Sequence, residues 1–141
     1  MENKRTTGPI WLSPLTLDNE IGIEFRGDHI HVEIGRTFTA DPDRRTAFWE
    51  KIRRICEEYG SKRVLIEGFA PSRDRDTSDI VASAQQTQIV PDLWMAFHFY
   101  DHEPDEGSEL FKVVAAAQGI RVKYFANAED ALLWLRRNTP A

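Results

Sequence analysis

Three short segments with the character of strands, separated by segments with helical patterning, constrain the fold of this chain more than any other feature. They cover residues 64–66, 93–100 and 120–125. The first two are apolar runs, which is typical of buried strands, and the third has Arg121 and Lys123 among branched and aromatic residues and is expected to be another strand. Strands that alternate with helices are parallel and joined by crossovers, so the pattern predicts an α/β fold.

A β-hairpin is expected before these units. Apolar residues alternate with polar or small ones over residues 21–25 and again over 30–34, and Gly27-Asp28 lies between the two segments. A period of two on both sides of such a turn predicts a hairpin with one apolar and one polar face. One face of the sheet should therefore be covered by other elements and the other should face solvent.

Four helices complete the expected fold. Asp41-Pro42 can begin the first, because aspartate is a good N-cap and proline fits the first helical position, and Gly60 can end it. Two more are expected over residues 79–89, with Thr77 or Ser78 as the cap, and over about 104–118; Asn127 should cap the last. The result is a small mixed sheet, led by the hairpin and covered by about four helices.

The domain organisation follows from length and turn residues. A chain of 141 residues is enough for one domain. Gly8-Pro9 and Ser13-Pro14 interrupt any regular element near the N-terminus. We therefore expect a partly ordered lead-in over residues 1–18 and a single α/β domain over 19–141.

Composition excludes several functional classes. Acidic residues outnumber basic ones 23 to 18, which disfavours a nucleic-acid partner, and no run of 18 apolar residues could insert into a membrane. The single cysteine, Cys56, rules out an internal disulfide and a cysteine-based zinc site. No apolar run follows Lys4-Arg5, as a signal peptide would require, so we expect a cytoplasmic protein. Phosphate-loop and dinucleotide motifs are missing, and no cofactor is expected.

The order of elements resembles the STAS domain, the fold of bacterial anti-sigma-factor antagonists, and more closely its STAS/SEC14-like branch. The resemblance covers about residues 20–138 and is carried by the element order, by the segment 125–135 (FANAEDALLWL) and by 91–97 (PDLWMAF). It implies a STAS-like α/β fold. It also implies a non-enzymatic regulatory or protein-interaction module, whose partner is another protein or a second copy in a homodimer.

STAS antagonists are phosphorylated on a serine in an Asp-Ser-Ser-Gly turn that follows the strand matched here by 64–66. Residues 67–79 lack that sequence and form a longer loop. Ser72, Thr77 and Ser78 are the only hydroxyl groups in the corresponding region, so they are the candidates for regulatory phosphorylation. The dipole of the following helix would stabilise a phosphate there.

Two groups of histidines and carboxylates are candidates for site chemistry. His29, His31 and Glu33 share one strand face with a spacing that could bind a divalent metal, although such an outer face is usually only solvated. His98, Asp101, His102 and Glu103 follow the expected central strand, at the edge where α/β proteins bind ligands, and could act as acid and base. The alternative for the second group is a buried, hydrogen-bonded His98 and an acidic surface loop.

The sequence assembles no convincing active site, so binding is preferred to catalysis. Two alternatives remain open. Several large rings could line a pocket that carries a small apolar ligand or lipid; they are Trp49, Trp94, Phe97, Phe99, Tyr100, Phe111 and Trp134. The second alternative is a small enzyme that uses the cluster from His98 to Glu103.

Overall fold

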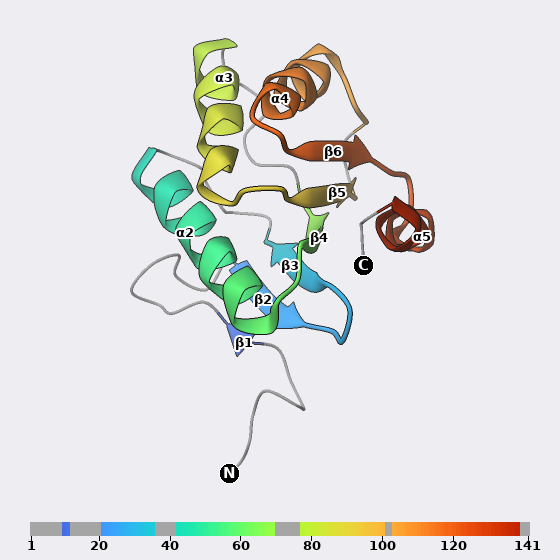
Figure 1. The fold of residues 1–141 in the computed structure, drawn as a ribbon. Helices are drawn as coiled ribbons and strands as arrows, with labels where there is room; N and C mark the ends of the chain where they lie inside the picture. The colour runs from blue at the N-terminus through green and yellow to red at the C-terminus, as the bar shows by residue number, and fades with distance from the viewer. Residues whose placement is uncertain (1–9, 12–20, 36–41, 70–76, 101–102, 139–141) are drawn as a thin grey trace.

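The structure is a computed structural model that describes residues 10–11, 21–35, 42–69, 77–100 and 103–138. Within these ranges, six strands form one mixed sheet in which each strand lies beside its neighbour in the chain (Figure 1). They are β1 (Ile10–Trp11), β2 (Ile21–Phe25), β3 (Ile30–Ile34), β4 (Arg63–Gly68), β5 (Trp94–Phe99) and β6 (Arg121–Tyr124). The first three strands pair antiparallel, and β3 to β6 pair parallel. The predicted α/β class, with a hairpin before the βα units, is confirmed.

The helices follow the strands closely in the chain. They are α2 (Pro42–Tyr59), α3 (Thr77–Gln86), the short 3-10 helix η3 (Thr87–Ile89), α4 (Glu106–Ala117) and α5 (Ala128–Asn138). Two starts differ from the sequence prediction. Helix α3 already begins at Thr77, so Thr77 and Ser78 lie in its first turn instead of capping it. Helix α4 begins at Glu106, because the side chain of Asp105 caps it by accepting a hydrogen bond from the backbone N–H of Ser108 at 3.0 Å.

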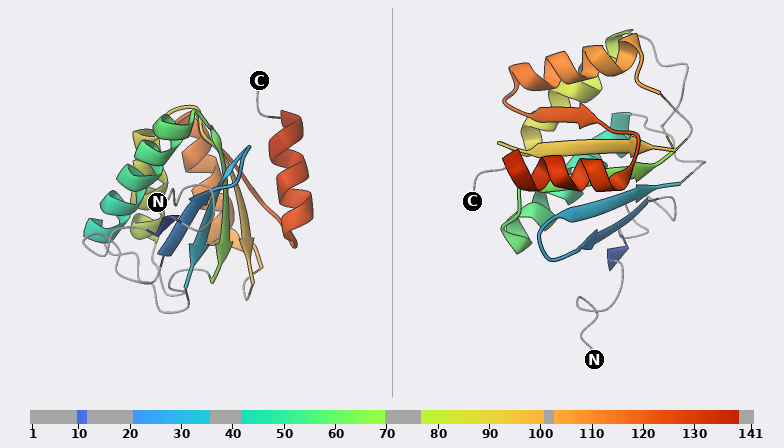
Figure 2. Two further views of the ribbon diagram at one scale, coloured as in Figure 1. Left: turned by 90° about the horizontal axis from the view of Figure 1, so that it is seen from below. Right: turned by 90° about the vertical axis from the view of Figure 1, so that its right-hand side faces the viewer.

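The sheet separates two layers of unequal size. Of the described helices, α2, α3 and α4 cover one face, and α5 lies against the other (Figure 2). The larger core joins inward residues of the strands, such as Ile23 and Val32, to Ile52 of α2, Ala84 of α3 and Phe111 of α4. This one-sided arrangement is expected when successive parallel strands are added in one direction by right-handed crossovers. None of the helices in the described part of the chain is long and apolar enough to cross a lipid bilayer.

Helix α5 is fixed at both ends. Its first turn is capped by Asn127, whose side chain accepts a hydrogen bond from the N–H of Asp130 at 2.8 Å, as expected from the sequence. Near its other end, Arg136 donates to Asp28 in the β2–β3 turn at 2.5 Å. This hydrogen bond, acting against burial, holds the pKa of Asp28 at about 2. The helix therefore runs back along the sheet from the end of β6 to the hairpin turn.

The apolar cover that α5 provides is short. It packs on Leu65 of β4 and Ala96 of β5, which form a second, smaller core with Ala131 and Leu135. Side chains on a strand alternate between faces, so the next residues on this face are Glu67 and His98. The face changes from apolar to polar at that point, which lies at the carboxyl end of the parallel strands.

Candidate functional site

Three polar side chains stand in a row across the carboxyl ends of three parallel strands. Glu33 of β3 is the register partner of Glu67 of β4, and Glu67 is the register partner of His98 of β5. His31 lies two residues before Glu33 and therefore on the same face. The topology thus gathers residues separated by more than sixty positions at the sheet edge where α/β proteins place their ligands.

Glu67 is the centre of this cluster, which we define as His31, Glu33, Glu67, His98 and Tyr100. The Oε1 atom of Glu67 is 2.7 Å from Nε2 of His31, and the Oε2 atom of Glu67 is 2.6 Å from Nδ1 of His98. The carboxylate side chain is only 12% exposed. Burial acts to raise its pKa, but the hydrogen bonds from His98 and His31 outweigh burial and hold the pKa below its usual value. Glu67 is therefore an anion at neutral pH.

Glu33 lies at the more exposed side of the cluster, and its two oxygens have contacts like those of Glu67. Its Oε2 accepts a hydrogen bond from the hydroxyl of Tyr100 at 3.0 Å, while its Oε1 lies 3.8 Å from Nε2 of His31. Partial burial, the hydrogen bond to Glu33 and the charges of Glu33 and Glu67 raise the pKa of Tyr100 to about 12. Tyr100 therefore keeps its proton at neutral pH and acts as a donor to Glu33.

The backbone at Gly68, the last residue of β4, helps to place the residues at this edge of the sheet. Gly68 has φ +124°, and a Cβ on it would lie 2.1 Å from the carbonyl oxygen of Ile34. Glycine alone fits that approach. The carbonyl of Gly68 accepts from the N–H of Tyr100 at 2.8 Å, and the N–H of Phe69 donates to Ile34 at 3.1 Å. The close approach of β3 and β4 behind Glu67 thus also determines the position of Tyr100.

The cluster offers donors that suit a metal ion. One nitrogen of His31 and one oxygen each of Glu33 and Glu67 lie within 4.8 Å of one another. Bonds of about 2.0–2.2 Å would place the ligand atoms of a tetrahedral ion about 3.4 Å apart. The two distances from His31 Nε2, 2.7 Å to Glu67 and 3.8 Å to Glu33, lie on either side of that value. Each of these two distances would have to change by less than an ångström, and the third, between the two carboxylate oxygens, is at most 4.8 Å.

The structure separates the three residues that the sequence suggested as metal ligands. His31 and Glu33 belong to the cluster, but His29 does not. Its Nδ1 is 2.7 Å from the side chain of Asp28, and its Nε2 is buried without a hydrogen-bond partner among the described residues. Burial lowers the pKa of His29. The expectation of a solvated outer face also fails, because His31 is only 5% exposed.

The catalytic candidates are divided as well. His98 joins the cluster through Glu67, while Glu103 is exposed, and Asp101 and His102 lie outside the described residues. Of the candidates for phosphorylation, Thr77 and Ser78 are exposed at the start of α3, and Ser72 is outside the described residues. Sequence reasoning missed Glu67 and the role of Tyr100. The signal that could have found Glu67 was a charged residue at the end of an otherwise apolar strand.

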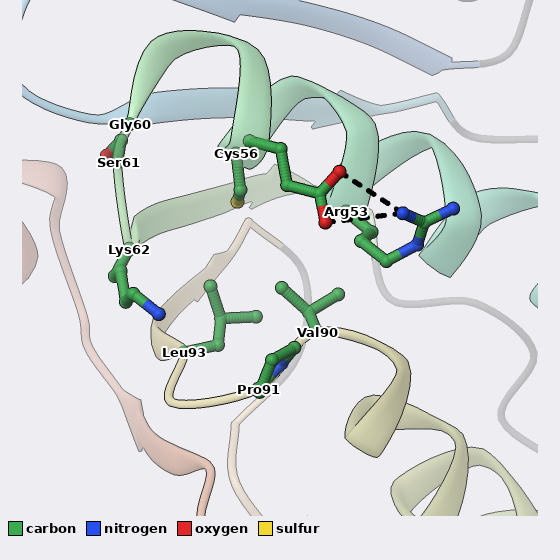
Figure 3. Close-up of a pocket in the computed structure, with 9 residues that line it drawn as sticks. Arg53, Cys56, Gly60, Ser61, Lys62, Val90, Pro91 and Leu93 are labelled. Carbon is green, nitrogen blue, oxygen red and sulfur yellow. Dashed lines mark hydrogen bonds and ion pairs between the residues drawn. The ribbon is translucent and has the colours of Figure 1, made fainter.

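A hollow of about 250 Å³ lies at the opposite end of the strands (Figure 3). It is lined by Arg53, Cys56, Glu57, Gly60, Ser61, Lys62, Val90, Pro91 and Leu93. None of these residues is aromatic, so the hollow does not match the ring-lined pocket expected of an apolar-ligand carrier. Burial raises the pKa of the Cys56 thiol to about 12, which makes the thiol a poor nucleophile.

Comparison of the chain with protein-family models, with curated proteins and with solved structures gives no match in any of the three.

Proposed function

We propose that this protein is a binding module that holds a divalent transition-metal ion between His31, Glu33 and Glu67. One observation carries the proposal. Each carboxylate has one oxygen near Nε2 of His31, and its other oxygen is hydrogen-bonded by a separate donor, Tyr100 for Glu33 and His98 for Glu67. Metal sites in proteins are built in this way, with outer groups that orient the ligating side chains.

Charge supports the same conclusion. Glu33 and Glu67 are direct neighbours across two strands, and like charges in such pairs are destabilising. Tyr100 and His98 hydrogen-bond the outer oxygens but do not separate the two inner ones. A divalent cation between the inner oxygens would convert this repulsion into attraction. The repulsion is thus a reason for the site to bind a cation.

The donor set narrows the class of metal. One imidazole nitrogen and two carboxylate oxygens suit zinc, manganese or ferrous iron. The cluster contains no sulfur, and the only cysteine is buried on α2 as part of the larger core. Soft ions such as cuprous copper are therefore disfavoured. Magnesium and calcium prefer sites made wholly of oxygen, which the nitrogen of His31 does not provide.

We place this site in a regulatory module of the STAS-like kind that the sequence suggests. The hairpin followed by βα units in sequential strand order supports that choice. So does the separation of the two catalytic candidates that the structure describes, because His98 lies in the cluster, where it contacts a carboxylate, while Glu103 is exposed. In this proposal the metal ion is a regulatory ligand that binds at the carboxyl edge of the parallel strands. The same edge contacts a partner protein or a second copy of the chain.

Isothermal titration of the full chain with Zn²⁺ tests the proposal. We expect one ion per chain, and a loss of at least tenfold in affinity in Glu67→Gln. His98→Gln, which leaves the three ligands in place, should weaken binding by about 10–100-fold. The matched control is Glu103→Gln, an exposed carboxylate of the same length. Equal zinc affinity in the wild type, Glu67→Gln and His98→Gln, each folded by circular dichroism, would overturn the proposal.

A further inference from the structure

The two carboxylates of the cluster are held with unequal strength. Glu67 has a short contact on each oxygen, 2.7 Å from Nε2 of His31 and 2.6 Å from Nδ1 of His98. The contacts of Glu33 are longer, 3.0 Å to the hydroxyl of Tyr100 and 3.8 Å to the same nitrogen of His31. Polar contacts weaken as they lengthen, so the position of Glu33 is the less firmly fixed of the two.

Exposure differs in the same direction. The side chain of Glu67 is 12% exposed, whereas that of Glu33 is 42% exposed. If Glu33 leaves a metal ion, its carboxylate becomes hydrated and keeps the hydrogen bond from Tyr100. If Glu67 leaves the ion, its charge stays largely shielded from water, which is costly for an anion. Detachment of Glu33 therefore requires less free energy than detachment of Glu67.

We propose that Glu33 is the exchanging ligand of the metal site. It detaches first when the ion leaves, while His31 and Glu67 still hold the ion. Tyr100 is the positioning residue that determines how readily Glu33 detaches. This inference rests on the proposed metal site and goes further, because it assigns an order to the release of the ligands. A site that opens at one exposed ligand suits a regulatory ion that is exchanged with solution.

Tyr100 is itself well placed for this role. Its ring makes edge-to-face contacts with Phe69 at 5.5 Å and with His98 at 5.3 Å between ring centroids, and its backbone N–H donates to the carbonyl of Gly68 at 2.8 Å. Such contacts restrict the ring and hold its hydroxyl at Oε2 of Glu33. The other oxygen of Glu33 is thereby directed toward His31. Removing the hydroxyl frees Glu33 to turn away without altering the ligating atoms of Glu67.

The order of release predicts how substitutions divide between the two rate constants. If the ion still contacts His31 and Glu67 in the transition state, a change that loosens Glu33 accelerates release. A change that loosens Glu67 slows association instead, because that contact is already formed in the transition state; the partition of mutational effects in folding kinetics follows the same logic.

Two substitutions of outer donors therefore have opposite kinetic signatures. Tyr100→Phe should release zinc about threefold to tenfold faster, as the loss of one hydrogen bond predicts, with the association rate unchanged. His98→Gln should bind zinc about 10–100-fold more weakly, with a release rate within about twofold of the wild type. Glu33→Gln, which weakens the ligand itself, should release zinc faster than Tyr100→Phe.

Stopped-flow release of zinc measures these rates. The full chain loaded with Zn²⁺ is mixed with an excess of the chelating dye pyridylazoresorcinol, and the absorbance of the dye–zinc complex gives the release rate. Competition with the same dye at equilibrium gives the dissociation constant, and the two values together give the association rate. Tyr59→Phe is the matched control, because it removes the hydroxyl of a tyrosine that packs against the larger core on the other face of the sheet. It should leave both rates unchanged.

The outcomes separate the order of release from the metal site itself. A Tyr100→Phe protein with the release rate of the wild type would overturn the order of release and leave the metal site standing. So would a His98→Gln protein that releases zinc faster than Tyr100→Phe and associates at the rate of the wild type. If the wild type binds no zinc, or Glu67→Gln binds it as tightly as the wild type, the metal site is wrong and this inference falls with it.

Discussion

Glu33 and Glu67 face each other as register partners on β3 and β4, and both direct a carboxylate oxygen toward the same nitrogen of His31. The arrangement is balanced by donors at the far oxygens, Tyr100 on one side and His98 on the other. These contacts explain how the charge of Glu67 can be partly buried on the sheet face that α5 covers only in part. They also make Glu67, with one short contact on each oxygen, the residue on which the metal-free cluster depends most.

We therefore expect Glu67→Gln to lower the free energy of unfolding of the metal-free protein by about 1–3 kcal/mol. The amide keeps the shape of the carboxylate but removes the negative charge that strengthens both hydrogen bonds, and its nitrogen faces one of the two imidazoles. Urea unfolding followed by circular dichroism, in the presence of a chelator, measures the change.

Glu103→Gln is the control for that experiment, because Glu103 is exposed. It should change the unfolding free energy by less than about 0.5 kcal/mol. A Glu67→Gln protein as stable as the control would show that the two histidines do not depend on the charge of Glu67.

A second prediction concerns the glycine behind the cluster. Gly68→Ala should destabilise the protein by about 3–5 kcal/mol, since it combines a positive φ with a Cβ 2.1 Å from the carbonyl oxygen of Ile34. Gly119→Ala has a positive φ as well, but nothing lies within 4 Å of its added Cβ. It should cost only about 1–2 kcal/mol. Thermal unfolding of both variants measures the difference, and equal costs would contradict the close approach of β3 and β4.

The sequence predicted most strands and helices of this fold because they depend on local patterns, but it did not predict that α5 covers part of the second face of the sheet. The alternation over 21–25 and 30–34, the capping role of Asn127, the apolar runs of β4 and β5 and the short segment of β6 are visible within a few residues. The two-residue strand β1 was not predicted, since Ile10 and Trp11 are flanked by turn residues and too short a stretch to show a period. Its pairing with β2 is a tertiary effect.

The cluster could be predicted only in part, because it depends on register. His31 and Glu33 were grouped with His29, their neighbour in the chain, while His98 was grouped with the residues that follow it. The structure instead brings together register partners on adjacent strands, which are Glu33, Glu67 and His98. A rule that compares the last outward-facing residue of successive parallel strands would have indicated Glu67. The hydrogen bond from Tyr100 to Glu33 depends on how far β5 extends past β3, which no local pattern encodes.

The third prediction is that Cys56 does not react in the folded protein. The thiol is 8% exposed, and burial raises its pKa to about 12, so the thiolate that reacts with alkylating agents is almost absent at neutral pH. Iodoacetamide followed by mass measurement should leave the native chain unmodified and add one label after denaturation. Rapid labelling under native conditions would show that the hollow beside Cys56 opens to solvent.

The last prediction concerns the contact between α5 and the hairpin turn. The pKa of Asp28 is about 2 in the folded protein, against a usual value of 3.8, chiefly because Arg136 donates a hydrogen bond to it. A lowered pKa contributes stability that is present above 3.8 and is lost as the pH falls from 3.8 toward 2. The Asp28 side chain is 36% exposed, so solvent screens the pair and limits this contribution to about 1 kcal/mol or less.

Asp28→Asn should therefore be less stable than the wild type at neutral pH, and the difference should disappear as the pH approaches 2. Urea unfolding of both proteins across this range measures it, and added salt should reduce the difference at neutral pH because the pair is near the surface. Asp92→Asn is the matched control, since Asp92 is more exposed and lies 3.8 Å from its partner Lys62. Parallel pH profiles for the wild type and Asp28→Asn would mean that packing on Leu65 and Ala96 alone holds α5 against the sheet.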